Sequence, residues 1–395
     1  MKYLTNWQIS YQKRVVDASE ALNVYLANGD RIFIGTGCGE PQHLLRELRA
    51  VLPEYQELEF VQGLSLGLNP VAEQCYERRC RLRSFFVSGE TREAIQEGRA
   101  DYAPVYQSRI PDLFKKGFVP IDLALIQVSP PDQHGFCSLG VSVDIVKAAI
   151  KSARTVIAQV NRYMPRVLGD TFVHFSEIDV FVEQDEPLVE MILPTQSAVA
   201  ERIAGYVTKL IEDGSTIQVG MGRLLNSVLV NLKDKKDLGV HSEFLSDAHL
   251  HLVKAGVITG KKKSIHKGKM IASFCMGSEE LYKFVENNPT VEFYPTEYVN
   301  DSSIIAQNYR MIALNSAIEV DLTGQVCADS LGHKIYSGIG GYVDFMMGAS
   351  RSEGGRSIVV LPSTTLDGKK SRIVAQLTKG AGVVTPRSNI EFVVT

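Results

Sequence analysis

The sequence predicts an α/β protein made of two similar open α/β domains related by internal duplication. The main observation is a set of three glycines that occurs twice. The offset is 185 residues in each case, for the pairs Gly29 and Gly214, Gly35 and Gly220, and Gly37 and Gly222. Two further similar segments, 121–140 and 317–332, are related by 189 residues, measured from Gly135 to Gly324. Strands that alternate with helices, repeated once along a chain, favour two sheets formed by duplication.

The residues around the first glycines predict a helix, a strand and a second helix. A helical pattern that begins near Glu20 ends at the turn 28–30, and an apolar strand is predicted over 31–34. The glycines of 35–37 then lead into a second helix near 41–48.

The second glycine set predicts the same order of elements. A helix that includes Glu201 ends at 212–214, a strand covers 216–219, and the glycines of 220–222 open a helix over 223–232. Pro187 and Pro194 fit a segment that crosses between the two copies. We therefore expect an N-terminal domain, 1–190, and a C-terminal domain, 191–395.

Composition narrows the class of protein. The chain has 395 residues, of which 45% are hydrophobic and 22% charged, with a net charge of -3. These values predict folded domains without the basic surface that nucleic acid or an anionic membrane requires. No apolar run is long enough for a membrane span, and the N-terminus lacks a signal-peptide core, so a cytoplasmic location is expected. The six cysteines form no Cys-x-x-Cys pair and are expected to be reduced and packed.

His241, His249 and His251, which lie close to Asp247, are candidate metal ligands. His-x-His spacing suits a metal best on a strand, but alternating His and Leu fits a half-buried element equally well. The accompanying thiolate or carboxylate pattern is missing. We therefore expect no metal and no tightly bound cofactor.

The glycine units can bind an anion, because free N–H groups at a helix start favour a phosphate. Neither copy completes Gly-x-Gly-x-x-Gly, since Glu40 and Leu225 occupy the third glycine position. The dinucleotide fingerprint therefore fails in both copies. Tight packing of a strand–helix turn remains the alternative for each copy.

Glu243 is the main candidate for covalent chemistry. It follows the charged run 233–237 and enters a segment of Val, Phe and Leu, where partial burial would leave its carboxylate poorly hydrated. Such a carboxylate can act as nucleophile or base. The alternative is a helix-capping or ion-paired glutamate.

Two other motifs bear on chemistry. Ser65 lies in Gly-x-Ser-x-Gly over 63–67, the nucleophile-elbow pattern of serine hydrolases, although Asn69-Pro70 interrupts the segment before a helix begins. The glycines of 338–341 leave backbone N–H groups uncovered, as a site for an oxyanion or a thioester carbonyl would.

Several long segments resemble the acetyl-CoA hydrolase/transferase family of coenzyme A transferases, especially its 4-hydroxybutyrate and butyryl-CoA:acetate branch. The resemblance covers nearly the whole chain. It rests on residues 35–41, 127–132 through 142–144, 241–243, 324–326 and 336–345.

The resemblance implies a ping-pong CoA-transferase in which Glu243 attacks an acyl-CoA thioester and then carries CoA as a glutamyl thioester. It also implies that Gly341 donates its N–H to the oxyanion. CoA is then a co-substrate, and short-chain acids such as 4-hydroxybutyrate, butyrate or acetate are the acyl groups. A homodimer or larger homo-oligomer is expected. The CoA-binding residues implied by the resemblance are Gly220, Met221, Gly222, Arg223, Leu224, Ile318, Gly340 and Lys369.

Three rivals stay open: an acyl-CoA hydrolase that uses the same glutamate, a non-catalytic CoA-binding protein, and a serine hydrolase that uses Ser65. The resemblance also departs at the end of the chain. Family members continue after the strand that matches 390–395 with a Glu-Tyr-Gly turn and a further helix, so we expect that a C-terminal segment is missing or divergent.

Overall fold

Both glycine sets follow a buried parallel strand. The computed structural model describes residues 6–73, 79–192, 198–365 and 367–395, and within them the chain forms two units. The first unit comprises Met1–Pro104, Arg109–Met191 and Val285–Asn288, and the second comprises Val105–Ser108, Ile192–Phe284 and Pro289–Thr395.

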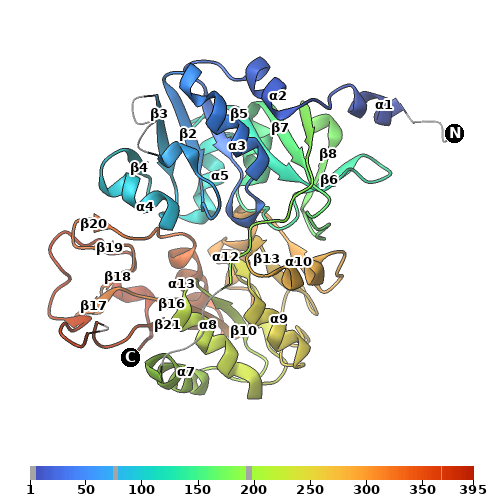
Figure 1. Ribbon diagram of the computed structural model, residues 1–395. Helices are drawn as coiled ribbons and strands as arrows, with labels where there is room; N and C mark the ends of the chain where they lie inside the picture. The colour runs from blue at the N-terminus through green and yellow to red at the C-terminus, as the bar shows by residue number, and fades with distance from the viewer. Residues whose placement is uncertain (1–5, 74–78, 193–197, 366) are drawn as a thin grey trace. The chain divides into compact units, whose positions relative to one another are not determined.

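The first unit contains a seven-stranded parallel sheet with the order β4-β3-β2-β1-β5-β7-β9 (Figure 1). A short antiparallel pair, β6 and β8, follows β5 in the chain. The strands are β1 (Arg31–Ile34), β2 (Leu58–Gln62), β3 (Cys80–Ser84), β4 (Ala100–Tyr102), β5 (Ile121–Val128), β6 (Phe136–Ser138), β7 (Ala153–Val160), β8 (Phe172–His174) and β9 (Val180–Glu183). The helices are α1 (Asn6–Gln12), α2 (Ala18–Tyr25), α3 (Gln42–Val51), α4 (Gly89–Gln96), α5 (Ile110–Lys115) and α6 (Val146–Ser152).

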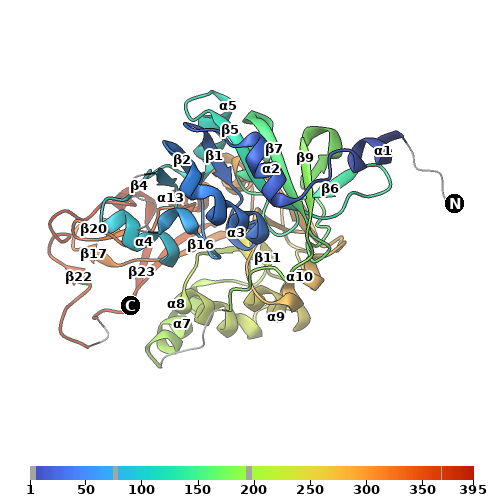
Figure 2. The same cartoon turned by 45° about the horizontal axis from the view of Figure 1, so that its top comes forward.

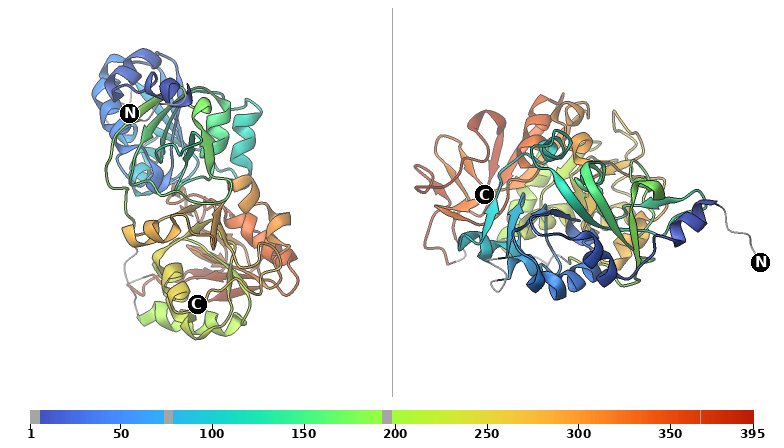
Figure 3. Two further views of the ribbon diagram at one scale, coloured as in Figure 1. Left: turned by 90° about the vertical axis from the view of Figure 1, so that its right-hand side faces the viewer. Right: turned by 90° about the horizontal axis from the view of Figure 1, so that it is seen from above.

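Alternate residues of β1 point to opposite faces of this sheet, and both faces are covered by helices (Figure 3). Ile32 and Ile34 join the core beneath α2 and α3, whereas Phe33 packs edge-on against Phe114 of α5. A strand buried on both faces reads as a continuous apolar run, which is how 31–34 was predicted.

The second unit contains a five-stranded parallel sheet with the order β11-β10-β16-β21-β23. Its strands are β10 (Thr216–Val219), β11 (Gly239–Val240), β16 (Met311–Ser316), β21 (Arg356–Val360) and β23 (Phe392–Val394). Its helices are α7 (Ala198–Leu210), α8 (Arg223–Val230), α9 (Asp247–Lys254), α10 (Glu279–Val285), α11 (Thr296–Val299), α12 (Ser302–Ile305) and α13 (Tyr342–Arg351). The short strands are β12 (Phe244–Leu245), β13 (Met270–Ala272), β14 (Phe274–Cys275), β15 (Val291–Phe293), β17 (Glu319–Asp321), β18 (Val326–Cys327), β19 (Ser330–Leu331), β20 (Lys334–Ile335) and β22 (Ile373–Val374).

Helix α7 lies beside α8 in this unit (Figure 2). Phe345 and Met346 of α13 pack against Met311 and Ala313 of β16. The α13 helix that begins after the predicted glycine loop is therefore anchored on the central sheet.

The strand order confirms the predicted duplication, because β2-β1-β5-β7-β9 and β11-β10-β16-β21-β23 have the same sequence connectivity. The offsets of 185 and 189 residues recur in one pair of equivalent hydrogen bonds, the first between the donors and the second between the acceptors. Gly35 N–H donates to Leu125 O at 2.9 Å, and Gly220 N–H donates to Leu314 O at 2.9 Å.

The turns after β5 and β16 repeat as well. Asp132 accepts hydrogen bonds from the backbone N–H groups of residues 134 and 136, and Asp321, 189 positions later, accepts from those of 323 and 325. Both strands predicted from the glycine pattern have the predicted bounds, 31–34 and 216–219.

One local detail differs from the prediction. In the first copy a 3-10 turn, Gly37–Gly39, separates the glycines from α3, which begins at Gln42. In the second copy Gly222 is itself the N-cap of α8, so these glycines open a helix directly.

The remaining bulk predictions have simple outcomes. Cys75 and Pro194 lie outside the described residues, and the other five cysteines are buried: Cys38, Cys80, Cys137, Cys275 and Cys327. Among the described helices, none combines the length and the apolar character needed to cross a bilayer.

Candidate active site

Glu243 lies on the extended segment between β11 and β12, with its side chain half-buried. This segment is held by backbone hydrogen bonds: Ser242 N–H donates to Ile271 O at 3.0 Å, and Ser273 N–H donates to Glu243 O at 2.9 Å. The helix-cap alternative for Glu243 is wrong, because the N-cap of α9 is Ser246.

The Glu243 carboxylate meets Asn300 and Gly341. Asn300 Nδ2 donates to Glu243 Oε2 at 3.0 Å, and Asn300 is fully buried. A Cβ built on Gly341 would overlap both Glu243 Oε2 and Asn300 Nδ2, within the 3.0 Å that real Cβ atoms keep from their neighbours. The structure thus brings together the two residues predicted as catalytic, and only glycine fits beside the carboxylate.

Gly341 also sets the electrostatics at the carboxylate. It is the N-cap of α13, whose first N–H groups and helix dipole favour negative charge. Preceding Gly340 has φ +48°, and its carbonyl accepts a hydrogen bond from Gln107 N–H at 3.2 Å. The glycine loop therefore places a helix N-terminus next to the Glu243 carboxylate, where it favours negative charge.

Several buried polar atoms on the segments next to Glu243 have no hydrogen-bond partner within the described residues. Such atoms are rare in folded proteins unless water or a ligand satisfies them. They are Ser242 Oγ, Ser273 Oγ, Asn300 Oδ1 and Tyr342 Oη.

A second buried carboxyl lies close by. Asp344, in the first turn of α13, accepts hydrogen bonds from Ser108 N–H at 3.1 Å and from Ser108 Oγ at 2.8 Å. The Asn300 side chain also hydrogen-bonds Asp344, and burial raises the pKa of Asp344 to about 7. Sequence reasoning missed Asn300, Asp344 and Ser108, although Asp344 lies inside the segment 336–345 that carried the resemblance.

Two basic side chains, His241 and Lys263, hold the segment that contains β11 in place. His241 is fully buried, and burial lowers its pKa to about 3, so the ring is neutral and lies 2.9 Å through Nε2 from Val299 O. Lys263 donates to Val240 O at 2.8 Å and to Lys269 O at 3.0 Å, and burial lowers its pKa to about 7. Both side chains tie the β11 segment to its neighbours.

The histidines weighed as metal ligands do not converge. His249 lies on helix α9 rather than on a strand, with its Nδ1 3.1 Å from Ser246 N in a capping box. Over the described ranges, no group of three or more His, Cys, Asp or Glu side chains is arranged to hold a metal ion.

The two glycine loops differ in whether a side chain caps the N-terminus of the helix that follows. At α8 no side chain caps the N-terminus, and Gly222 has φ +130° with open space around its Cα. Gly220 packs closely instead, since a Cβ there would lie 2.5 Å from Asn315 Oδ1. The predicted CoA loop, Gly220 to Leu224, is thus a tight turn followed by an uncapped helix start.

In the first copy the corresponding helix start is already filled. Gln159 Oε1 accepts hydrogen bonds from His43 N–H at 3.1 Å and Leu44 N–H at 3.4 Å in α3. A Cβ on Gly39 would lie 2.8 Å from Ser142 Cβ. The anion-site prediction is therefore wrong for this copy, where the packing alternative holds.

Ile318 and Lys369 are two further residues predicted to contact CoA. Ile318 N–H donates to Cys327 O at 2.8 Å, so a backbone hydrogen bond from Ile318 to a ligand would have to use its carbonyl. Lys369 lies in a turn with 81% of its side chain exposed and Asp367 3.8 Å away.

Ser65 does not form a nucleophile elbow. It is fully buried, its Oγ accepts a hydrogen bond from Asn69 Nδ2 at 3.1 Å, and its loop leads into the 3-10 turn Pro70–Ala72 rather than an α-helix. An elbow serine requires an exposed hydroxyl on a strand-to-helix turn.

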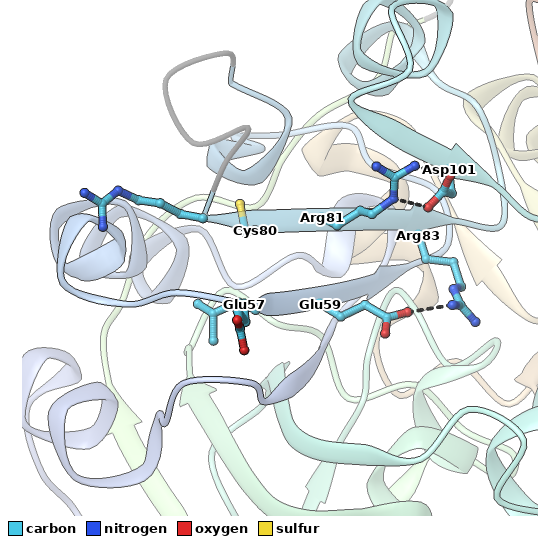
Figure 4. A pocket seen from close by; sticks show the side chains of 8 residues that line it. Glu57, Glu59, Cys80, Arg81, Arg83 and Asp101 are labelled. Carbon is cyan, nitrogen blue, oxygen red and sulfur yellow. Dashed lines mark hydrogen bonds and ion pairs between the residues drawn. The ribbon is translucent and has the colours of Figure 1, made fainter.

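A surface pocket of about 480 Å³ in the first unit lies at the N-terminal ends of β2 and β3 (Figure 4). Two of its three arginines are ion-paired, Arg81 with Asp101 and Arg83 with Glu59 at 2.9 Å, and Arg79 donates to Tyr55 O at 3.4 Å. Ligands of parallel α/β sheets bind at the carboxyl ends of the strands, and this pocket lies at the opposite ends with Arg81 and Arg83 neutralised by their ion pairs. We therefore assign this pocket no part in the chemistry.

The fold and the site define an α/β enzyme with a half-buried carboxylate held at a helix N-terminus. The chain belongs to the acetyl-CoA hydrolase/transferase family: residues 2–193 match its N-terminal domain and residues 277–395 its C-terminal domain. The predicted family is therefore confirmed.

Curated relatives agree in class. The chain is 45% identical over 389 residues to the 4-hydroxybutyrate coenzyme A transferase of Clostridium kluyveri, covering 98% of this chain and 90% of that protein. It is 34% identical over 395 residues to the butyryl-CoA:acetate CoA-transferase of Anaerostipes caccae, covering 98% and 88%. The predicted class of enzyme, a CoA-transferase, is confirmed.

Solved structures agree in fold. RipA from Yersinia pestis superposes with a TM-score of 0.91 at 32% identity, covering 99% of this chain and 90% of that one. The 4-hydroxybutyrate CoA-transferase from Porphyromonas gingivalis superposes with a TM-score of 0.81 at 34% identity, covering 98% and 90%.

Proposed function

We propose that this protein moves CoA between a short-chain acyl-CoA and a carboxylic acid through a covalent thioester on Glu243. The observation that carries the proposal is the Glu243 carboxylate, hydrogen-bonded by Asn300 at 3.0 Å beside the glycine that begins α13. Partial burial weakens the hydration of this carboxylate, and a helix N-terminus can stabilise the tetrahedral oxyanion that its attack creates.

The reaction has two halves. In the first, a Glu243 carboxylate oxygen attacks the thioester carbonyl, the C–S bond breaks, and an acyl-glutamyl anhydride and CoA thiolate form. The thiolate then attacks the glutamyl carbonyl, which releases the first acid as a carboxylate and leaves glutamyl-CoA. In the second half, the acceptor carboxylate runs the same steps in reverse.

CoA is proposed as a co-substrate that meets Gly220, Met221, Gly222, Arg223 and Leu224 through the uncapped start of α8, with further contacts from Ile318, Gly340 and Lys369. No metal or tightly bound cofactor is needed for these steps. The acids proposed are 4-hydroxybutyrate, butyrate and acetate, in line with the names of the relatives. The homo-oligomer and the cytoplasmic location stay predictions.

Mass spectrometry after incubation with butyryl-CoA and no acceptor tests the mechanism. We expect a CoA adduct on the peptide that contains Glu243, absent in Glu243→Gln. Ser65→Ala is the control for the serine hydrolase, and it should form the adduct normally. An adduct on another peptide, or full turnover by Glu243→Gln, would contradict the proposal.

The acyl-CoA hydrolase is the second candidate, because water can take the place of the acceptor acid. One relative, at 22% identity over 387 residues, is the acetyl-CoA hydrolase of Neurospora crassa. Release of free CoA with and without added acetate separates the two activities. A transferase passes CoA to the added acetate as acetyl-CoA, so little free CoA accumulates with or without acetate. A hydrolase releases free CoA continuously in both conditions.

A further inference from the structure

We propose that Asp344 and Ser108 are positioning residues that orient the Asn300 amide, and through it the Glu243 carboxylate. This inference rests on the proposed role of Glu243. It assigns a task to a buried carboxyl that the ping-pong steps do not use.

The first step of the argument concerns the Asn300 amide, which lies between two carboxyl groups. Its Nδ2 donates to Glu243 Oε2 at 3.0 Å, and its side chain also hydrogen-bonds Asp344. Its Oδ1 accepts no hydrogen bond within the described residues. The amide nitrogen therefore serves both carboxyl groups, as its two N–H bonds allow.

The second step concerns orientation. An asparagine amide presents either its nitrogen or its oxygen to a neighbour, and the difference is decided by the groups around it. An ionised Asp344 only accepts hydrogen bonds, so it attracts the Asn300 nitrogen. If the amide turned over, its oxygen would face Glu243 Oε2 and repel the attacking carboxylate.

The third step concerns what holds Asp344. Ser108 donates twice to it, from its N–H at 3.1 Å and its Oγ at 2.8 Å. The preceding Gln107 donates its N–H to Gly340 O at 3.2 Å. The segment Val105–Ser108 therefore hydrogen-bonds both the glycine loop and the first turn of α13. Ser108 precedes Asp344 by 236 residues in the chain.

The second unit contains a matched pair for control experiments. Asp247, in the first turn of α9, accepts from Ser278 N–H at 3.1 Å and from Ser278 Oγ at 2.7 Å. This pair has the same chemistry as Asp344 and Ser108 but is not hydrogen-bonded to Asn300. Asp247→Asn and Ser278→Ala therefore report the cost of breaking such a pair without the effect on orientation.

The test measures the rate of CoA adduct formation on Glu243 in a single turnover, together with the KM for butyryl-CoA. For Asp344→Asn we expect the rate to fall about 10- to 100-fold with little change in KM, because the new amide can donate to Asn300 Oδ1 and turn the Asn300 amide over. For Ser108→Ala we expect a smaller fall of about 3- to 10-fold, because the backbone donor remains. Asp247→Asn and Ser278→Ala should keep the rate of the unaltered protein.

A double-mutant cycle decides whether Asp344 acts through Asn300. If it does, Asp344→Asn adds no further loss in an Asn300→Ala background. Additive losses, or an unaltered rate in both Asp344→Asn and Ser108→Ala, would overturn the inference while the Glu243 adduct still forms. Absence of the adduct from the unaltered protein would overturn the proposed function itself. Should Asp344→Asn not fold, Ser108→Ala alone and in the Asn300→Ala background gives the same decision.

Discussion

The Cα of Gly341 lies so close to the Glu243 carboxylate that no side chain fits between them. A Cβ on Gly341 would overlap Glu243 Oε2 and lie 3.0 Å from Glu243 Cδ. The Glu243 carboxylate and the start of α13 therefore constrain each other. The first prediction tests this contact.

Gly341→Ala is expected to lower kcat by at least about 100-fold, because the new methyl group displaces Glu243 or Asn300 by more than the tolerance of a reacting geometry. Steady-state kinetics and the adduct measurement check this. Gly205→Ala is the control: Gly205 is exposed within α7 with no atom within 4 Å of a built Cβ. That change should leave kcat unaltered and stabilise the protein by about 1 kcal/mol. A normal kcat in Gly341→Ala would contradict the prediction that the close contact between Gly341 and Glu243 is required for activity.

Gly222→Ala is expected to raise the KM for acyl-CoA about tenfold with a smaller effect on kcat, because it strains the loop at the uncapped start of α8. Gly222 has φ +130°, which side chains rarely adopt. Its counterpart in the first copy, Gly37, has φ +58° and no atom within 4 Å of a built Cβ. Gly37→Ala should cost stability without changing KM, since Gln159 already occupies that helix start. Equal effects on KM in both variants would contradict the assignment of the CoA loop.

Activity is expected to fall as the pH falls through about 7, the pKa to which burial raises Asp344. The ionised form only accepts hydrogen bonds and so favours the Asn300 nitrogen, whereas the protonated form has an O–H that can donate to Asn300 Oδ1 and turn the amide over. The groups that act on Asp344 are Ser108, Asn300 and the Asp301 carboxylate, and the Asp301 charge adds to the rise in pKa. The pH profile of adduct formation checks this. In Asp344→Asn the inflection near pH 7 should disappear, and an unchanged inflection would assign it to another group.

Stability is expected to fall with rising pH because of Glu40. This fully buried carboxyl has its pKa raised by burial to about 8, although hydrogen bonds from Gly67 N–H, at 2.7 Å, and from the Ser65 side chain oppose the rise. The folded protein therefore holds more protons than the unfolded chain between pH 4.5 and about 8, so this stabilisation is complete below pH 4.5 and lost as pH passes about 8.

Urea denaturation at pH 5 and pH 8 checks this prediction. In Glu40→Gln the loss of unfolding free energy between these pH values should shrink by on the order of 1–4 kcal/mol, since one such group contributes up to about 1.4 kcal/mol per pH unit. Glu93→Gln, a change at an exposed glutamate of α4, is the control and should leave the difference as it is. An identical pH dependence in Glu40→Gln and the unaltered protein would contradict the prediction.

The sequence by itself determined the elements that depend on neighbouring residues. Strands 31–34 and 216–219 were predicted with their observed bounds, because an apolar run between two glycine turns is a local signal. The duplication followed from the spacing of those turns. Glu243 and Gly341 were predicted as catalytic through segments long enough to carry a family resemblance.

Only the tertiary structure decided which residues surround these positions. Asn300 reaches Glu243 from 57 residues away, and Ser108 reaches Asp344 from 236 residues away, so no local pattern marks either contact. The same holds for the two glycine loops, which look alike in sequence. Gln159, 116 residues from His43, fills one helix start, while the other has no side-chain cap. Local propensity and spacing specify strands and turns, but hydrogen-bond partners across a fold are set by packing.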